Sequence, residues 1–277
     1  MQDSPISLEL LALEVNKVVR QVALFIAQQA QAFDTRRIEY KGKNDLVSYV
    51  DKEAERRLIN ALKTLLPEAG FIAEESVSEQ QLSEKEYHWI IDPLDGTTNF
   101  VHQLPVYAIS IALTQGSEVV LGVVYEVNRK ECFYAWKGGG AYCNGLPIHC
   151  SKADTLAQSL LATGFPYYDF ARMPHYLRIL EDLMQQSHGL RRLGSAAVDL
   201  AYVACGRFEA FFEYNLQAWD VAAGALLVQE AGGLVSDFAA GQNYLFGREI
   251  LAAGPTLQAP MLEVIRKHWA QEKDIKK

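Results

Sequence analysis

Cysteines are few in this chain, and their spacing matches no common metal or redox motif. The four are Cys132, Cys143, Cys150 and Cys205, and no two of them form a C-x-x-C pair. This spacing argues against a zinc ribbon or a thioredoxin-type dithiol. The sequence therefore predicts free thiols in a reducing compartment.

Long apolar runs are also absent. No stretch approaches the ~20 apolar residues that a membrane-spanning helix needs. The first residues, Met1 to Pro5, lack the basic segment and apolar core of a signal peptide. We therefore expect a cytoplasmic protein that does not engage a membrane.

The motifs of several large enzyme classes are missing. The chain contains no G-x-S-x-G, no Walker loop and no G-x-G-x-x-G, and its six histidines show no ligand spacing. The run Gly138-Gly139-Gly140 lacks the Lys and the Ser or Thr of a phosphate-binding P-loop. Nucleophilic catalysis by Ser, Cys or His therefore has no support.

Positive charge is in deficit. Lys and Arg number 26 against 34 Asp and Glu, which leaves a formal charge of −8. Nucleic-acid backbones demand a basic surface, so we expect no direct nucleic-acid partner. An acidic chain is compatible with a carboxylate site for divalent cations.

The remaining composition is that of a globular protein. The chain has 277 residues, of which 49% are hydrophobic, enough for a sizeable core. Apolar residues at spacings of three and four predict helices over residues 7–33, 51–66, 218–231 and 256–269, with Asp51 capping the second. Apolar runs between turn residues predict strands over residues 71–73, 89–92, 107–113, 119–127, 132–136, 160–163, 208–213 and 251–253.

No repeat or low-complexity linker divides the chain. We expect one compact unit of two halves, residues 1–150 and 151–277, that meet at a cleft. The first half carries the D-P-L-D-G-T motif, and the second carries W-D-V-A-A-G.

The strongest chemical signal follows the apolar run 89–91. Asp92 and Asp95 lie three residues apart, and they would repel each other unless a cation lay between them. Mg²⁺ suits such hard oxygen ligands, and the Leu94 carbonyl could be a further one. The amides of Gly96 and Thr97 could bind phosphate oxygens as a small nest. The alternative is a solvated Asp-Pro-x-Asp-Gly turn at the end of a strand.

Two further acidic positions are weaker signals in isolation. Glu74 follows another short apolar run, and it could meet Asp92 if both strands end at the same edge of a sheet. A surface acidic pair, Glu74 with Glu75, is the alternative. Asp220 falls in the first turn of the helix predicted from residue 218, where Asp commonly complements the helix dipole.

Taken together, three segments resemble the inositol monophosphatase family, within the wider Mg-dependent, Li-sensitive phosphatase superfamily. They are residues 70–76, 92–100 and 219–224, and the resemblance covers roughly residues 8–265. It implies an α+β fold, the five-layer αβαβα sandwich of the sugar-phosphatase type. It also implies a homodimer, with the active site between the layers.

The resemblance implies a set of residue roles. Mg²⁺ ions would be held by Glu74, Asp92, Asp95, Asp220 and the carbonyl of Leu94. A metal-bound water, oriented by the catalytic residues Glu74 and Thr97, would attack the phosphoester in line, and a second metal would stabilise the leaving alkoxide. The Thr97 hydroxyl would in turn be held by Asp51, the third residue assigned to catalysis.

The resemblance also implies which residues hold the substrate. The amides of Gly96 and Thr97 would bind the phosphate, together with the side chains of Asp95 and Asp220. Glu213 would bind ring hydroxyls, and the segment Gly194-Ser195-Ala196 would line the sugar pocket. Thr98-Asn99-Phe100 matches inositol phosphatases, so the leading hypothesis is a phosphatase that converts inositol 1-phosphate to inositol and phosphate.

Two alternatives stay open. One is a phosphatase for another small phosphate, such as fructose 1,6-bisphosphate, a 3′-phosphonucleotide or histidinol phosphate. The other is a bacterial relative that acts mainly as a protein-binding partner of the transcription machinery. The chain departs from some relatives at Gly164-Phe165-Pro166, where they carry a polar Ser in the pocket strand, and both Lys41 and Lys43 are candidates for the basic residue of the first loop.

Overall fold

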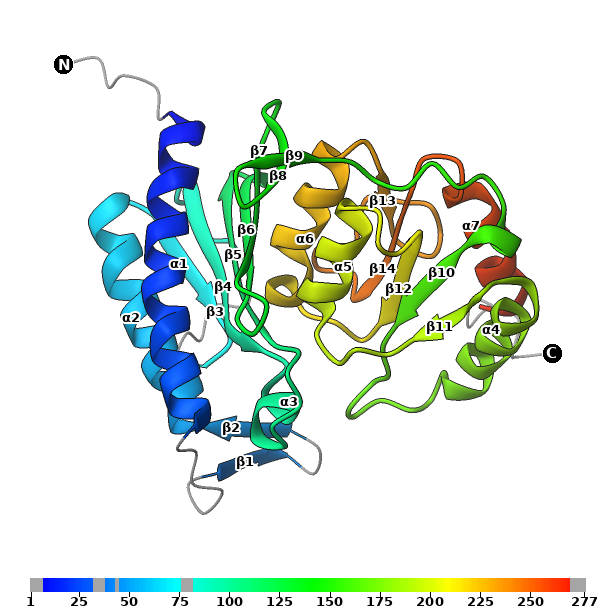
Figure 1. Cartoon of the computed structure of the whole chain (residues 1–277), viewed down its shortest axis with the longest axis horizontal. Helices are drawn as coiled ribbons and strands as arrows, with labels where there is room; N and C mark the ends of the chain where they lie inside the picture. The colour runs from blue at the N-terminus through cyan, green and yellow to red at the C-terminus, as the bar shows by residue number, and fades with distance from the viewer. Residues whose placement is uncertain (1–6, 32–37, 43–44, 76–81, 270–277) are drawn as a thin grey trace.

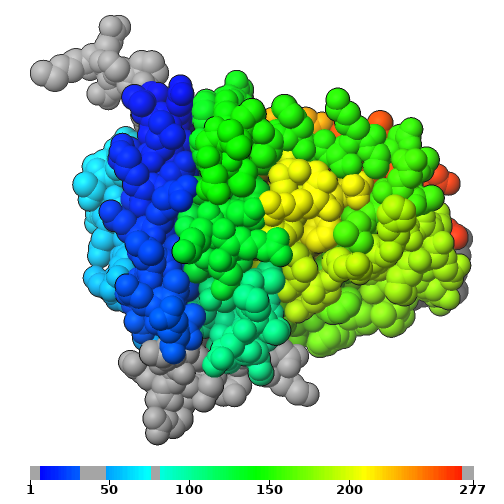
Figure 2. Space-filling model, in the orientation of Figure 1, coloured from blue at the N-terminus to red at the C-terminus, as the bar shows by residue number. Residues whose placement is uncertain are grey.

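The computed structural model describes residues 7–31, 38–42, 45–75 and 82–269. Their helices and strands stack in five layers, αβαβα (Figure 1). The space-filling view shows one elongated body in which the two halves are in continuous contact on the visible face (Figure 2). The predicted α+β sandwich is confirmed. All four cysteines are free thiols, and among the described residues no helix is long and apolar enough to cross a membrane.

The first layer consists of α1 (Leu8–Gln31) and α2 (Tyr49–Leu65). The apolar stripe of α1 is buried against α2 and the large sheet, as its spacing predicts. The start of α2 differs from the prediction. Ser48 is the N-cap, its hydroxyl accepting from the Val50 amide at 3.1 Å, and Asp51 is the third helical residue, accepting from the Ser48 amide at 2.9 Å. Ser48 has an extended backbone, which an N-cap requires.

The second layer is a seven-stranded sheet in the order β3-β4-β5-β6-β7-β8-β9. Its strands are β3 (Gly70–Ala73), β4 (Tyr87–Asp95), β5 (Ala108–Gln115), β6 (Glu118–Glu126), β7 (Glu131–Trp136), β8 (Gly140–Cys143) and β9 (Leu146–Ile148). Only β3 and β4 are parallel. The turn that follows β8 has positive φ angles at Asn144 and Gly145.

The stretch from Asp92 to Asp95 is a second difference from the prediction. It is not a turn after the strand but the irregular end of β4, where the pairing with β5 shifts in register. Pro93 has no amide hydrogen to donate to a ladder, which is compatible with such an irregularity. The shift lets β4 carry two carboxylates at its end.

The fourth layer is a five-stranded sheet in the order β11-β10-β12-β14-β13. Its strands are β10 (Leu160–Thr163), β11 (Gly189–Arg191), β12 (Ala210–Tyr214), β13 (Leu234–Ser236) and β14 (Glu249–Ala253). The outer layer is formed by α4 (Met173–Gln186) and α7 (Gln258–His268). The short strands β11 and β13, and the strand β1 (Ile38–Gly42) that pairs with β2 (Asp45–Ser48), are not among the strands predicted from the sequence.

The central layer contains α5 (Ala196–Ala204) and α6 (Ala218–Glu230), which lie between the two sheets (Figure 1). Small residues let these helices pack closely. A Cβ on Gly224 would lie 2.4 Å from the Leu200 Cβ, and a Cβ on Gly122 would lie 2.7 Å from the Ala223 carbonyl oxygen. Because both helices are covered on two sides, they show no strong amphipathic stripe.

Candidate active site

A cavity of about 320 Å³ is lined by residues from both halves of the chain. Its wall combines the end of β4, the segment that follows β10, the first turns of α5 and α6, and the end of β12. Every site residue named from the sequence lines this cavity except Asp51, which lies behind Thr97. Lys43 lies outside the described residues, and so does the side chain of Lys41.

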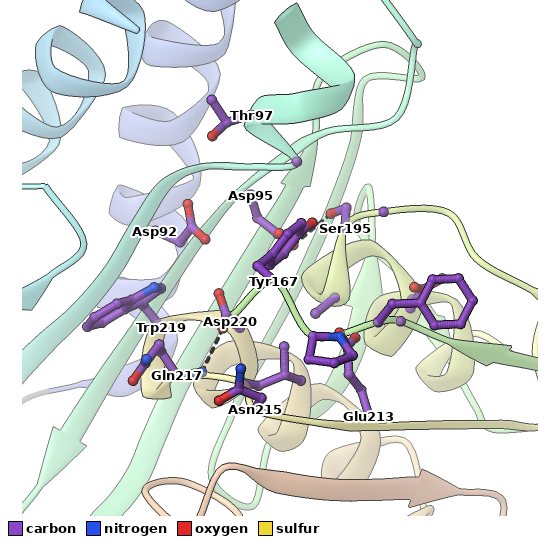
Figure 3. Close-up of a pocket in the computed structure, with 18 of the residues that line it drawn as sticks. Asp92, Asp95, Thr97, Tyr167, Ser195, Glu213, Asn215, Gln217, Trp219 and Asp220 are labelled. Carbon is purple, nitrogen blue, oxygen red and sulfur yellow. Dashed lines mark hydrogen bonds between the residues drawn. The ribbon is translucent and has the colours of Figure 1, made fainter. Parts of the chain in front are cut away.

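Three of the carboxylates that line the cavity lie close together. Asp92 and Asp95 come from β4 and Asp220 from α6, and one oxygen of each lies within 4.8 Å of the others (Figure 3). Glu74, just after β3, lines the same cavity and is close enough to Asp92 to raise its pKa. The parallel pairing of β3 with β4 brings these two strand ends to the same edge.

Burial raises the pKa of each clustered aspartate, and neighbouring carboxylates raise it further for Asp92 and Asp220. Burial raises the pKa of Asp92 well above its usual range, and the charges of Glu74, Asp95 and Asp220 raise it further. The pKa of Asp220 rises to about 7, again through burial first and then through Asp95. A buried cluster of carboxylates destabilises its ionised form unless a positive charge lies nearby. The donors are all hard oxygens, which fits Mg²⁺ or Ca²⁺ better than a thiophilic metal.

Asp95 also ties the two halves together. Its Oδ2 accepts hydrogen bonds from the Ser195 hydroxyl and the Ala197 amide, both at 2.7 Å. Ser195 is the N-cap of α5 and accepts from the Val198 amide. These donors oppose the effect of burial, and the pKa of Asp95 rises only to about 6.

Asp220 combines the two roles that the sequence left open. It is the third residue of α6, and its Oδ2 accepts from the Gln217 amide at 2.7 Å, which completes a capping box. Figure 3 shows the same carboxylate directed toward Asp92 and Asp95. Capping and membership of the acidic cluster therefore coexist. The Ser110 hydroxyl donates to the Trp219 carbonyl at 3.0 Å and fixes the start of this helix on β5.

Thr97 lies at the start of α3 (Thr97–Val101). Its hydroxyl lies 2.7 Å from Asp51 Oδ1 and 3.0 Å from the Leu94 carbonyl oxygen, and its single proton can serve either acceptor. Asp51 is fully buried, and burial raises its pKa against the hydrogen bonds from Ser48 and Thr97. Gly96 has a φ of 99°, a left-handed conformation that favours glycine.

The Thr98-Asn99-Phe100 segment supports the site instead of lining it. The Asn99 amide nitrogen donates to the carbonyls of Val106 and Leu193, both at 2.8 Å. It thereby holds the chain just before Gly194. The Phe100 ring is buried edge-to-face against Tyr107. Asn99 thereby connects α3 to the segment that precedes Gly194 in the other half of the chain.

Several lining residues were not anticipated from the sequence. Arg192 donates to the Tyr167 hydroxyl at 3.2 Å, and its charge lowers the pKa of Asp95 and Glu213. Asp199 is 1% exposed, and its Oδ1 has no hydrogen-bond partner among the described residues. Burial and the nearby Glu213 raise the pKa of Asp199 well above its usual range. The available signal was a lone Asp in the otherwise apolar helix α5.

The sequence and the fold are similar to those of known proteins. Residues 9–270 match the model of the inositol monophosphatase family. The Nus factor SuhB of Escherichia coli K12 is 42% identical over 250 residues, covering 90% of this chain and 93% of that protein. The crystal structure of the extragenic suppressor protein suhB from Bartonella henselae has a TM-score of 0.85 at 36% identity, covering 91% of this chain and 96% of that one.

A Thermotoga maritima IMPase structure has a TM-score of 0.83 at 33% identity and covers 92% of this chain and 96% of that one. The match of the family model, the similarity of these relatives and the shared five-layer fold agree over almost the full length. The chain therefore belongs to the inositol monophosphatase family.

Proposed function

We propose that this protein is a Mg²⁺-dependent phosphomonoesterase that hydrolyses inositol 1-phosphate to inositol and phosphate. The observation that carries the proposal is the cluster of Asp92, Asp95 and Asp220 within 4.8 Å of one another, beside Glu74 and at the wall of a polar cavity. Family membership supports the same chemistry.

Mg²⁺ ligands in this proposal are Glu74, the three aspartates and the carbonyl of Leu94. When bound, Mg²⁺ supplies a Lewis acid for the phosphate and lowers the pKa of a coordinated water. The protein's own groups set the geometry. The hydrogen bonds of Asp95 to α5 and of Asp220 to Gln217 hold the carboxylates in place before any ligand arrives.

The remaining residues orient the reactants. Glu74 and the Thr97 hydroxyl hold the attacking water, and Asp51 holds that hydroxyl through the 2.7 Å hydrogen bond. The amides of Gly96 and Thr97 bind the phosphate. Glu213 and the segment 194–196, which line the same cavity, bind the hydroxyls of the leaving polyol. Such positioning can supply much of the rate enhancement in phosphoryl transfer.

A panel of phosphate esters tests the substrate. Phosphate release is measured with Mg²⁺, with and without Li⁺, on inositol 1-phosphate, fructose 1,6-bisphosphate, a 3′-phosphonucleotide and histidinol phosphate. The proposal expects the highest kcat/KM for inositol 1-phosphate and inhibition by Li⁺. Much faster hydrolysis of another ester would replace inositol 1-phosphate with that substrate.

A second function has support of a different kind. The E. coli relative at 42% identity is named a Nus factor. We infer that this chain can act as a protein partner of the transcription machinery, with its phosphatase site intact. The test is a pull-down with purified bacterial transcription proteins, using wild type and Asp95→Asn. Equal capture by both proteins supports a partner role that is separate from catalysis, and no capture by wild type contradicts it.

We also propose that residues 1–150 and 151–277 form one catalytic unit and that two such units make a homodimer. The hydrogen bonds from Ser195 and Ala197 to Asp95 support the first part, because each half supplies groups to the same site. Light scattering on the purified protein tests the second part. A monomer at micromolar concentration would contradict it.

A further inference from the structure

Gly164 lies directly against the carboxylate of Glu213. Gly164 follows β10, Glu213 belongs to β12, and these strands pair in parallel with Thr163 opposite Phe212. A Cβ added to Gly164 would lie 2.0 Å from Glu213 Oε2 and 2.2 Å from Oε1. The carboxylate therefore occupies the space that a side chain at position 164 would need.

Backbone conformation does not require glycine at this position. The φ of Gly164 lies outside the left-handed region, in contrast to those of Gly96 and Gly194. Alanine is therefore sterically allowed by the backbone alone. The Cβ of an alanine at position 164 would first contact the carboxylate end of the flexible Glu213 side chain. The lowest-energy response is movement of that carboxylate, with the fold retained.

The surroundings of Glu213 restrict where a displaced carboxylate could go. Glu213 is 6% exposed, and the negative charges of Asp220 and Asp95 raise its pKa while Arg192 lowers it. Asp199, also buried, lies close enough to Glu213 for the two charges to repel. A shift of Glu213 would therefore change the positions of the hydrogen-bond acceptors that line the cavity.

We propose that Gly164 is a positioning residue for substrate specificity. The absent side chain leaves room for the Glu213 carboxylate at the wall of the cavity, where it accepts hydrogen bonds from hydroxyl groups of the leaving alcohol. This inference rests on the proposed phosphatase function and adds the residue that sets its leaving-group preference.

Gly164→Ala tests the inference, with inositol 1-phosphate and p-nitrophenyl phosphate as substrates. The kcat/KM for inositol 1-phosphate divided by that for p-nitrophenyl phosphate should fall about tenfold or more, which is the size expected for loss of a hydrogen bond to a charged group. The change should lie mainly in the KM for inositol 1-phosphate. An unchanged ratio would overturn the proposal.

A double-mutant cycle separates this role from a general defect. Glu213→Ala removes the group that Gly164 accommodates, so adding Gly164→Ala to it should change the ratio less than twofold. A further tenfold fall in that background would overturn the proposal. If wild type prefers another hydroxylated ester, the proposed substrate fails, and the ratio for that ester to p-nitrophenyl phosphate still tests Gly164.

Discussion

Ser195→Ala should lower both the stability of the protein and its affinity for Mg²⁺, because the one hydroxyl caps a helix and also bonds a proposed metal ligand. Ser195 is 2% exposed, donates to Asp95 Oδ2 at 2.7 Å and accepts from the Val198 amide as the N-cap of α5. Loss of a cap costs about 1 kcal/mol, and loss of a hydrogen bond to a charged group costs about 1.5–3 kcal/mol. Since the Ala197 amide still bonds Asp95, we expect about 2–3 kcal/mol in total.

The effect on Mg²⁺ follows from the pKa of Asp95. The Ser195 hydrogen bond lowers that pKa against burial, so its removal raises the pKa and favours the protonated form. Protons then compete better with the cation. We expect the Mg²⁺ affinity of Ser195→Ala to fall about tenfold near neutral pH, which corresponds to ~1.4 kcal/mol.

Urea unfolding and isothermal titration with Mg²⁺ measure the two effects separately. Ser159→Ala is the matched control, because Ser159 is also buried and its hydroxyl donates to the Thr155 carbonyl at 2.7 Å. That variant should lose stability of about 1 kcal/mol and keep its Mg²⁺ affinity. The reasoning is refuted if Ser195→Ala is no less stable than the control and binds Mg²⁺ as wild type does.

Three further substitutions test other buried contacts of the site and of the helices beside it. The advantage of Asp199→Asn over wild type in thermal stability should grow as pH rises. Burial raises the folded pKa of Asp199 above 3.8, so the stability that the protonated Asp199 contributes to wild type is present in acid and is lost at higher pH. A Tm difference that shrinks from pH 5 to 8 would contradict this. Thr97→Val should lower kcat about 100-fold with Mg²⁺ affinity retained; kinetics with wild-type kcat would exclude a role for its hydroxyl. Gly224→Ala should lose about 1–3 kcal/mol in urea unfolding, because its Cβ would lie 2.4 Å from the Leu200 Cβ. An unfolding midpoint equal to that of wild type would show that the α5–α6 contact can relax.

Periodicity predicted the long elements well. The spacing of apolar residues predicted α1 to within two residues of each end, and an apolar run closed by Gly232 and Gly233 predicted α6. The three-residue strands β11 and β13 carry no such pattern, since their pairing is decided by the neighbouring strands. The predicted cap of α2, Asp51, differs from the observed cap, Ser48, although Ser followed three residues later by Asp resembles a capping box.

Site residues within one short motif were easier to find than those joined by the fold. Asp92 and Asp95 stand out in the sequence, and so does Asp220 once the family resemblance is drawn. The contact of Asp95 with Ser195 spans 100 residues, so no local pattern announces it. Asp199 was overlooked because a single Asp in a helix is usually exposed. The contact between Gly164 and Glu213 depends on the pairing of β10 with β12 and is visible only in three dimensions.

We expect Asp95 to belong to a cation site that phosphate-ester hydrolysis requires. Asp95→Asn keeps one side-chain oxygen to accept from Ser195 and Ala197, so the fold should persist. Phosphate release from inositol 1-phosphate is measured against Mg²⁺ concentration, with Asp154→Asn at an exposed position as the control. Loss of activity in Asp95→Asn, with the control equal to wild type, is the predicted result. Full activity in Asp95→Asn would contradict the assignment of the site.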